Sequence, residues 1–341
     1  MSSVHHIDTT AKDLRAFLDW LLSRSRQQDM PGGGRTFRRK CVRLWGLWPL
    51  PPLIDEVHEV VYVDGIHLGR KAVVLIARTE KFVLGWYVAR TERTRAWVAL
   101  MERIAPPDVV ITDGGPGFAR AVKQCWPDTR VQRCTFHAFA LIKIATTTRP
   151  RLDCSKELYA LGKQLLKVHS LEQATTWLSD YSHWRFQWAT FLAQKTQIEG
   201  RLIDTHPRLL RARGSLDRLI KDGTLFTYLD PELLAEITWI PATNNLIEGG
   251  TNTQLRAMMR DHRGLSLTRR IKAIFWWCYQ HTECPLSPAQ LLRVMPTDAD
   301  IEASYQRVRD ADDLAGHLPG WGDAITWSDL HHTTPRTNTW D

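Results

Sequence analysis

The sequence predicts an α/β fold in which a mixed sheet is flanked by helices and interrupted by an all-helical insertion. Between about residues 57 and 137, short runs of β-branched and aromatic residues are interleaved with helical apolar patterns. From residue 138 to about residue 240, apolar positions recur at helical intervals and few β-rich runs occur. Hydrophobic residues make up 43% of the 341 residues, so a sizeable core is possible.

The strands are predicted from β-rich runs bounded by turn and helix signals. They are expected over about residues 57–68, 71–77, 82–88, 108–113 and 129–134. One helix begins near Thr94 and ends before Pro106-Pro107, and another spans residues 117–125. This β-β-β-α-β-α-β order, with an Asp at the first and fourth strands, is the plan of an RNase H-like sheet.

Three acids occupy positions that indicate one site. Asp64 interrupts the apolar first strand, and an ionised Asp buried there needs a cation or a hydrogen-bond cage. Asp113 ends the fourth strand, where ligands of open α/β sheets gather. Glu248 follows Thr243 and Asn244, either of which can cap the helix that carries it. Together they form an oxygen-only cluster suited to hard divalent ions; for Asp64 alone, the alternative is a satisfied core or turn residue.

The N-terminal region reads as a small DNA-binding segment. A helix over Ala11–Arg24 is followed by the break Pro31-Gly32-Gly33-Gly34 and then by a basic stretch that includes Arg38 and Arg39. This succession of a helix, a glycine-rich break and a basic helix resembles a helix-turn-helix fragment that can lie against DNA. The alternative is a solvated basic helix on a small bundle.

These patterns divide the chain into segments. We expect a helical, helix-turn-helix-like segment over 1–50, a first catalytic part over 57–137, a helical insertion over 138–240, a second catalytic part with the Glu-bearing helix over 241–284, and a tail over 285–341.

Charge and cysteine content narrow the function classes. The net charge of +8 and the sequence pI of about 9.3 favour a polyanionic partner. The six cysteines form no C-x-x-C pair, so neither a zinc ribbon nor a disulfide framework is indicated. No signal-peptide core or membrane-spanning run occurs, and we expect a cytoplasmic protein with no membrane partner.

Four motifs follow one another along the chain: Tyr62-Val63-Asp64-Gly65, Ile111-Thr112-Asp113-Gly114, Cys134-x-x-His137 and Asn244-Asn245-x-x-Glu248. In this order they resemble the Mutator-type transposases of bacterial insertion sequences, a group of DDE transposases, and the resemblance covers about residues 57–280. A long helical interval before the Glu also matches the group. The combination of motifs is specific, although each motif alone is weak.

The resemblance implies a DNA transposase that performs metal-dependent strand cleavage and strand transfer of an insertion sequence. Asp64, Asp113 and Glu248 would be catalytic and would hold two Mg²⁺ ions, with Mn²⁺ as a substitute. The partners would be double-stranded DNA, as terminal repeats and as target, and further copies of the chain in a homodimer or higher oligomer. The bacterial protein would be associated with the nucleoid.

Other residues gain candidate roles from the same resemblance. Cys134 and His137 look like half of a zinc site, but no further ligands lie nearby in the sequence. We therefore expect His137 to contact DNA or to orient a neighbour, with Cys134 in support; a structural histidine is the alternative. Trp239 is a candidate for stacking on a flipped base, with core packing as the alternative.

A basic helix face follows the third acid. Asn252 and Arg256 lie four and eight residues beyond Glu248, an interval that places all three on one face of a helix. Such a face can present an amide and a cation to a phosphate backbone, and Arg260 extends it. The alternative is a surface salt-bridge face.

Two other functions are compatible with the same residues. An RNase H-like nuclease or resolvase would use the same acids without strand transfer. A truncated or domesticated transposase would only bind DNA, and related proteins often carry a zinc-binding segment and a full helix-turn-helix that this sequence does not show.

Overall fold

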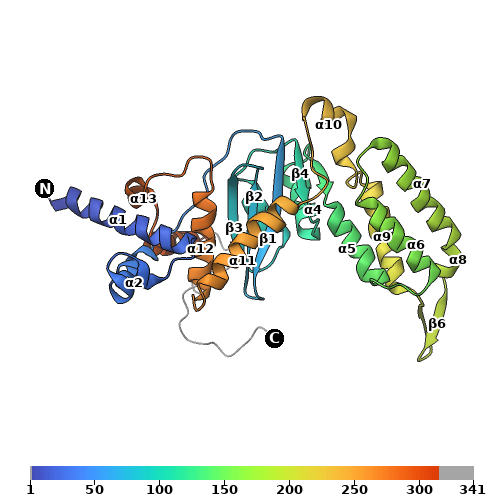
Figure 1. Ribbon diagram of the computed structural model, residues 1–341, viewed down its shortest axis with the longest axis horizontal. Coiled ribbons are helices and arrows are strands. Elements are labelled where there is room, and N and C mark those ends of the chain that lie inside the picture. Colours follow the sequence, from blue (N-terminus) through green and yellow to red (C-terminus); the bar gives the residue numbers. More distant parts are fainter. Residues whose placement is uncertain (1, 315–341) are drawn as a thin grey trace.

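The computed structural model describes residues 2–314, with side chains from residue 10 to residue 307. A sheet-centred lobe occupies the middle of an elongated molecule (Figure 1). Helices α1 (Ser2–Leu22) and α2 (Gly33–Leu44) lie at one end, and a helical lobe lies at the other.

The central sheet has five strands in the order β3-β2-β1-β4-β5. They are β1 (Val60–Leu68), β2 (Ala72–Arg78), β3 (Val83–Ala89), β4 (Val109–Thr112) and β5 (Arg130–Arg133). The first three pair antiparallel, whereas β4 is parallel to both β1 and β5. The predicted α/β fold, with a mixed sheet flanked by helices, is confirmed.

Helices cover both faces of this sheet. Strand alternation turns Val61 and Val63 toward α3 (Thr94–Met101) and α4 (Pro116–Cys125), where they share a core with these helices. Tyr62 and Ile66 face the other way, into a core shared with α1, α2, α11 (Asn252–Asp261) and α12 (Leu267–Gln280). Asp64 lies between Tyr62 and Ile66 in this alternation and therefore faces the α11 side.

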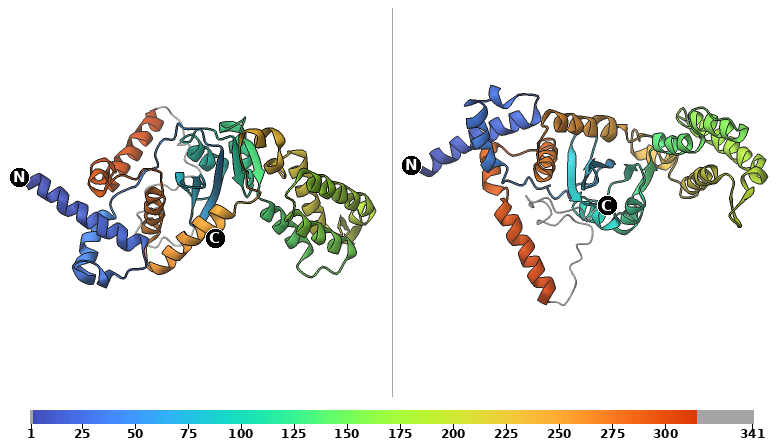
Figure 2. Two further views of the ribbon diagram at one scale, coloured as in Figure 1. Left: turned by 45° about the horizontal axis from the view of Figure 1, so that its top comes forward. Right: turned by 90° about the horizontal axis from the view of Figure 1, so that it is seen from below.

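Buried polar contacts, as well as apolar ones, join the N-terminal region to the sheet lobe. The ammonium group of Lys272 on α12 is buried; it donates to Trp45 O at 2.6 Å and pairs with Asp298. Trp48 Nε1 donates to the same carboxylate at 2.6 Å. Near this junction lie the 3₁₀ turn η1 (Gln27–Asp29), α13 (Pro288–Val294) and the start of α14 (Asp298–Leu314), which extends away from the body (Figure 2).

The helical lobe has its own core. It contains α5 (Thr135–Thr146), α6 (Asp153–Leu165), α7 (Leu171–Gln187), α8 (Ala189–Leu192), α9 (Pro207–Lys221), η2 (Thr227–Leu229) and α10 (Pro231–Glu236). Stacked rings of Trp177, Tyr181 and Trp184 lie in this core.

The expectation of an all-helical insertion is wrong at one place. Strands β6 (Lys195–Ile198) and β7 (Arg201–Asp204) form a hairpin that projects from the lobe (Figure 1). Its two-residue turn, Glu199-Gly200, has φ values of 50° and 75°, as a primed hairpin turn requires. Almost every residue of the hairpin is exposed, so its sequence lacks the alternation that marks a half-buried strand.

Two further findings concern membranes and the tail. No helix of the described part is long and apolar enough to cross a membrane. Of the tail predicted over 285–341, residues 315–341 lie outside the described residues.

Candidate functional site

Asp64 is a mostly buried carboxylate in the middle of β1. Its Oδ1 accepts a hydrogen bond from Gly65 N at 2.8 Å, and its Oδ2 accepts one from Asn252 Nδ2 at 2.7 Å. Burial raises the pKa of Asp64 to about 7, and the negative charges of Asp113, Glu248 and Glu92 act in the same direction. A cation at this point would offset the accumulated negative charge.

Asp113 lies level with Asp64 because β4 pairs parallel to β1, with Ile111 opposite Tyr62. It directly follows Thr112, the last residue of β4, and the chain then turns at Gly114, where φ is +82°. Gly114 N donates to Thr112 Oγ1 at 3.0 Å, which fixes the turn. A side chain at Gly114 would overlap the guanidinium of Arg133, so the glycine also makes room for that cation.

Glu248 is carried by the π-helical turn η3 (Leu246–Thr251), which continues into α11. The preceding Asn244 is fully buried and joins three parts of the site. Its Nδ2 donates to Val63 O at 2.9 Å, its backbone N–H donates to Cys134 Sγ at 3.2 Å, and its carbonyl accepts from Glu248 N at 3.1 Å. Single π-turns are frequent at functional sites.

The expected side-chain cap of this helix is not formed. Within the described residues, Asn244 Oδ1 accepts no hydrogen bond, and the amide group is used instead to hold β1 beside η3. A tertiary contact has therefore replaced a local one.

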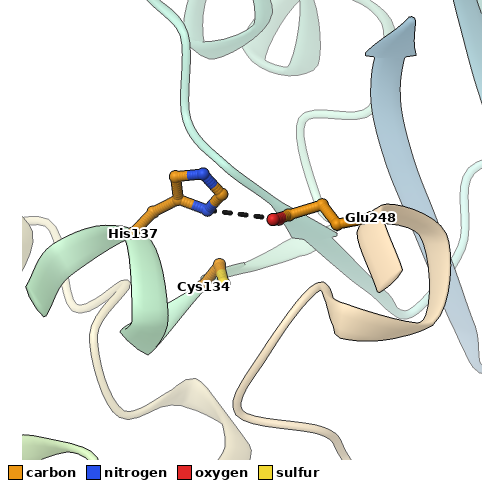
Figure 3. A group of neighbouring side chains, drawn as sticks. All are labelled: Cys134, His137 and Glu248. Carbon is orange, nitrogen blue, oxygen red and sulfur yellow. Dashed lines mark ion pairs between the residues drawn. The ribbon is translucent and has the colours of Figure 1, made fainter. Parts of the chain in front are cut away.

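Cys134 and His137 lie beside Glu248 (Figure 3). Cys134 ends the link from β5 into α5, His137 lies one turn later, and His137 Nδ1 is 3.2 Å from Glu248 Oε1. The neighbouring Cys134 thiol and Glu248 carboxylate raise the pKa of His137 to about 10. The sequence showed no third candidate ligand for this pair, and the fold brings the carboxylate of Glu248 to within 4.8 Å of both.

Two charged residues of the site escaped the sequence analysis. Arg133 ends β5, and its charge interacts with Asp113 and Glu248. Glu92 precedes α3; a side chain at Gly65 would overlap its carboxylate, which pairs with His67 Nε2 at 2.9 Å. Burial raises the pKa of Glu92, and the charge of Asp113 adds to this effect. Arg133 could have been predicted, because it ends a strand that runs parallel to β4 and so lies near Asp113. No feature of the sequence pointed to Glu92.

The remaining predicted residues divide between the site and the surface. Asn252 is 2% exposed, and its amide is directed at Asp64 rather than at solvent. Arg256 and Arg260 are exposed along α11. Trp239 is 63% exposed, so the alternative of core packing is wrong for it.

The N-terminal arginines are exposed but lie in another part of the molecule. Arg38 and Arg39 are on α2, at the end of the molecule opposite the helical lobe (Figure 1). Arg38 Nε donates to Gln27 Oε1 at 3.3 Å.

Sequence comparison adds two findings. Residues 61–199 match the family described as Transposase, Mutator family. A transposase for insertion sequence element IS905 from Lactococcus lactis subsp. lactis (strain IL1403) is 23% identical over 138 residues. That similarity spans 35% of this chain and 35% of the relative, so it concerns about a third of each protein.

Proposed function

Because residues 61–199 relate this chain to the Mutator-type insertion-sequence transposases, we propose that it is a DDE DNA transposase with an RNase H-like catalytic core. It cleaves DNA at the ends of an insertion sequence and joins the ends to target DNA in a metal-dependent reaction. Asp64, Asp113 and Glu248 are the catalytic carboxylates. The family match ends at residue 199, so the role of Glu248 is inferred from the site.

One observation carries the proposal. Three acids from distant segments lie close enough to interact electrostatically: burial raises the pKa of Asp64, and the charges of Asp113 and Glu248 raise it further. A fold stabilised without ligands gains nothing from assembling like charges, because their repulsion and desolvation oppose folding. Such an assembly is typical of a site for cations and phosphate chemistry.

The residues present fit the implied Mg²⁺ ions. Carboxylate oxygens are the ligands that Mg²⁺ prefers, and Asp64, Asp113 and Glu248 would hold two such ions, with Mn²⁺ as a substitute. When bound, these ions would supply Lewis-acid assistance to the attacking and leaving oxygens of a phosphodiester.

Neighbouring residues prepare the carboxylates for this role. The hydrogen bond from Asn252 Nδ2 fixes the Asp64 carboxylate, and His137 Nδ1 lies 3.2 Å from Glu248 Oε1. Arg133 lies where its charge offsets those of Asp113 and Glu248. The bond from Asn252 holds Asp64 in position before a substrate arrives, which lowers the reorganisation needed in the reaction.

The DNA would follow exposed cations and one exposed ring. Arg256 and Arg260 continue from the Glu248 helix, and phosphate contacts there would position the duplex near the acids. Trp239 presents its indole to solvent for stacking on a base. Arg38 and Arg39 would contact DNA farther along the molecule.

The proposed partners follow from the reaction. They are double-stranded DNA, as the terminal repeats of the element and as the target, and a second or further copy of this chain that holds the other end. The reaction assigns the protein to the bacterial cytoplasm, at the nucleoid.

The test is metal-dependent cleavage and joining of a labelled duplex that carries an element end. Wild type should give joined products with Mg²⁺ or Mn²⁺, whereas Asp64→Asn, Asp113→Asn and Glu248→Gln should bind the duplex without cutting it. Asp128→Asn, at an exposed site, is the matched control and should remain active. Cleavage without joining would favour a nuclease or resolvase, and binding without metal-dependent chemistry would favour a DNA-binding protein.

A further inference from the structure

Three side chains of different chemistry converge beside the acids. Cys134 Sγ, a ring nitrogen of His137 and a carboxylate oxygen of Glu248 all lie within 4.8 Å of one another (Figure 3). Cys134 and His137 share one face at the start of α5, and Glu248 approaches from η3. Two separate elements therefore supply the group, and Cys134 is 1% exposed.

Two of these atoms are buried without a regular hydrogen bond. His137 Nδ1 and Glu248 Oε1 lie 3.2 Å apart, yet among the described residues neither has a hydrogen-bond partner of normal geometry. The two atoms form an ion pair outside regular hydrogen-bond geometry, an arrangement into which an ion could enter as a common partner. Cys134 Sγ is already oriented, since it accepts the Asn244 N–H at 3.2 Å.

We infer that Cys134, His137 and Glu248 form a site for one thiophilic divalent ion such as Zn²⁺, and that this ion inhibits the protein by holding Glu248 away from Asp64 and Asp113. A set of one sulfur, one nitrogen and one oxygen suits Zn²⁺ and is unsuited to Mg²⁺. Three protein ligands leave a fourth tetrahedral position for water.

The distances are compatible with such an ion. Zinc bonds of about 2.0–2.3 Å in a tetrahedron place the ligand atoms about 3.3–3.6 Å apart. The imidazole and carboxylate atoms are already at 3.2 Å, and the thiol lies within 4.8 Å of both. A small movement of side chains closes the site without moving α5 or η3.

Inhibition follows from the shared carboxylate. When Glu248 Oε1 binds the ion beside α5, that oxygen is no longer available to the cluster of Asp64 and Asp113. The binding part of this inference is independent of the proposed function, whereas the inhibitory part rests on it.

Cobalt is the probe for binding, because Co²⁺ replaces Zn²⁺ and absorbs light when a thiolate is a ligand. The full chain should bind one Co²⁺ with a thiolate charge-transfer band that Zn²⁺ removes. Cys134→Ser should lose this band and bind at least about tenfold more weakly. Cys284→Ser, which changes an exposed thiol, is the matched control and should keep the band.

A second variant protects the test against misfolding. His137→Gln keeps the thiol and should also weaken Co²⁺ binding at least about tenfold, while thermal melting reports whether each variant folds. Absence of the band in wild type, or its persistence in Cys134→Ser, would overturn the site.

Inhibition is measured as the ratio of cleavage with and without micromolar Zn²⁺ at fixed Mg²⁺, within each variant. The ratio should fall in wild type and in Cys284→Ser and stay near one in Cys134→Ser. Zn²⁺ binding without inhibition of an active wild type would overturn the regulatory part. A wild type that binds Co²⁺ through Cys134 but never cleaves would contradict the proposed function and the inhibitory part, and leave the metal site standing.

Discussion

Asp64→Asn should stabilise the protein in the absence of divalent ions at pH 8. The wild-type carboxylate is mostly buried and lies near three other acids, so its ionisation opposes folding. An Asn can keep both native contacts, because its Oδ1 can accept from Gly65 N and the amide of Asn252 can turn its Oδ1 toward the new NH₂ group. Asn252 Oδ1 has no other partner in the described part of the chain.

The magnitude follows from the difference in proton affinity between the folded and unfolded states. The folded pKa of Asp64 is about 7, in place of an ordinary value of 3.8. A raised pKa stabilises the protonated folded state, so this contribution is fully present below about pH 4 and is lost as the pH rises through 7. The loss amounts to about 4 kcal/mol, which Asp64→Asn avoids because its side chain does not ionise.

Urea unfolding at pH 5 and pH 8, with a chelator present, measures this effect. The free energy of unfolding of Asp64→Asn should exceed that of wild type by more at pH 8 than at pH 5. In thermal unfolding at pH 8, Asp64→Asn should melt on the order of 8 °C above wild type. Adding Mg²⁺ at 100 times its dissociation constant should stabilise wild type alone by about 2.7 kcal/mol. Asp128→Asn is the exposed control. If the free energies of unfolding of wild type and Asp64→Asn show the same pH dependence, the pKa of Asp64 is not raised in the folded state.

Three further predictions concern residues around the site and the junction. Glu92→Gln removes one charge near Asp113, so the Mg²⁺ concentration for half-maximal cleavage should rise about threefold to tenfold, and an unchanged value equal to that of exposed Glu102→Gln would argue against a role. Trp239→Ala should weaken DNA binding by about 1–3 kcal/mol in a fluorescence titration without lowering the melting temperature, since the indole is 63% exposed. Lys272→Met removes a buried donor to Asp298 and should lower the free energy of unfolding by about 1–3 kcal/mol in urea; no loss would mean that the ion pair contributes nothing net.

The sequence predicted the sheet well because its strands are made of residues that few other environments accept. Runs of Val and Ile around Asp64 and before Asp113 fit a buried strand, and the parallel register that pairs Tyr62 with Ile111 places Asp113 level with Asp64. The proximity of these two acids therefore follows from the pairing of two neighbouring strands. Their catalytic use stays a prediction.

The polar contacts of the site were beyond sequence reasoning. The bond from Asn252 to Asp64 spans 188 positions and that from Asn244 to Val63 spans 181, so both depend on how distant elements are placed. Local rules gave Asn244 a capping role, but the tertiary contact prevailed because it satisfies a strand carbonyl at a buried position. The β6–β7 hairpin was missed because its residues are almost all exposed, so they do not alternate between apolar and polar as in a half-buried strand.

The attachment of the helical lobe explains how a long insertion and a compact site coexist. Thr135 N donates to Ala242 O at 3.0 Å, and Asn244 N donates to Cys134 Sγ at 3.2 Å, so the chain leaves and re-enters the sheet lobe at one place. The lobe buries its apolar residues almost wholly among its own helices. Changes within the lobe should therefore alter what the molecule contacts, whereas changes at this closure should move Glu248 relative to Asp64. The closure also contains Cys134, so an ion bound there would act on one of the contacts that couple the lobe to the acids; the bond from Arg133 N to Thr224 O at 2.7 Å is another.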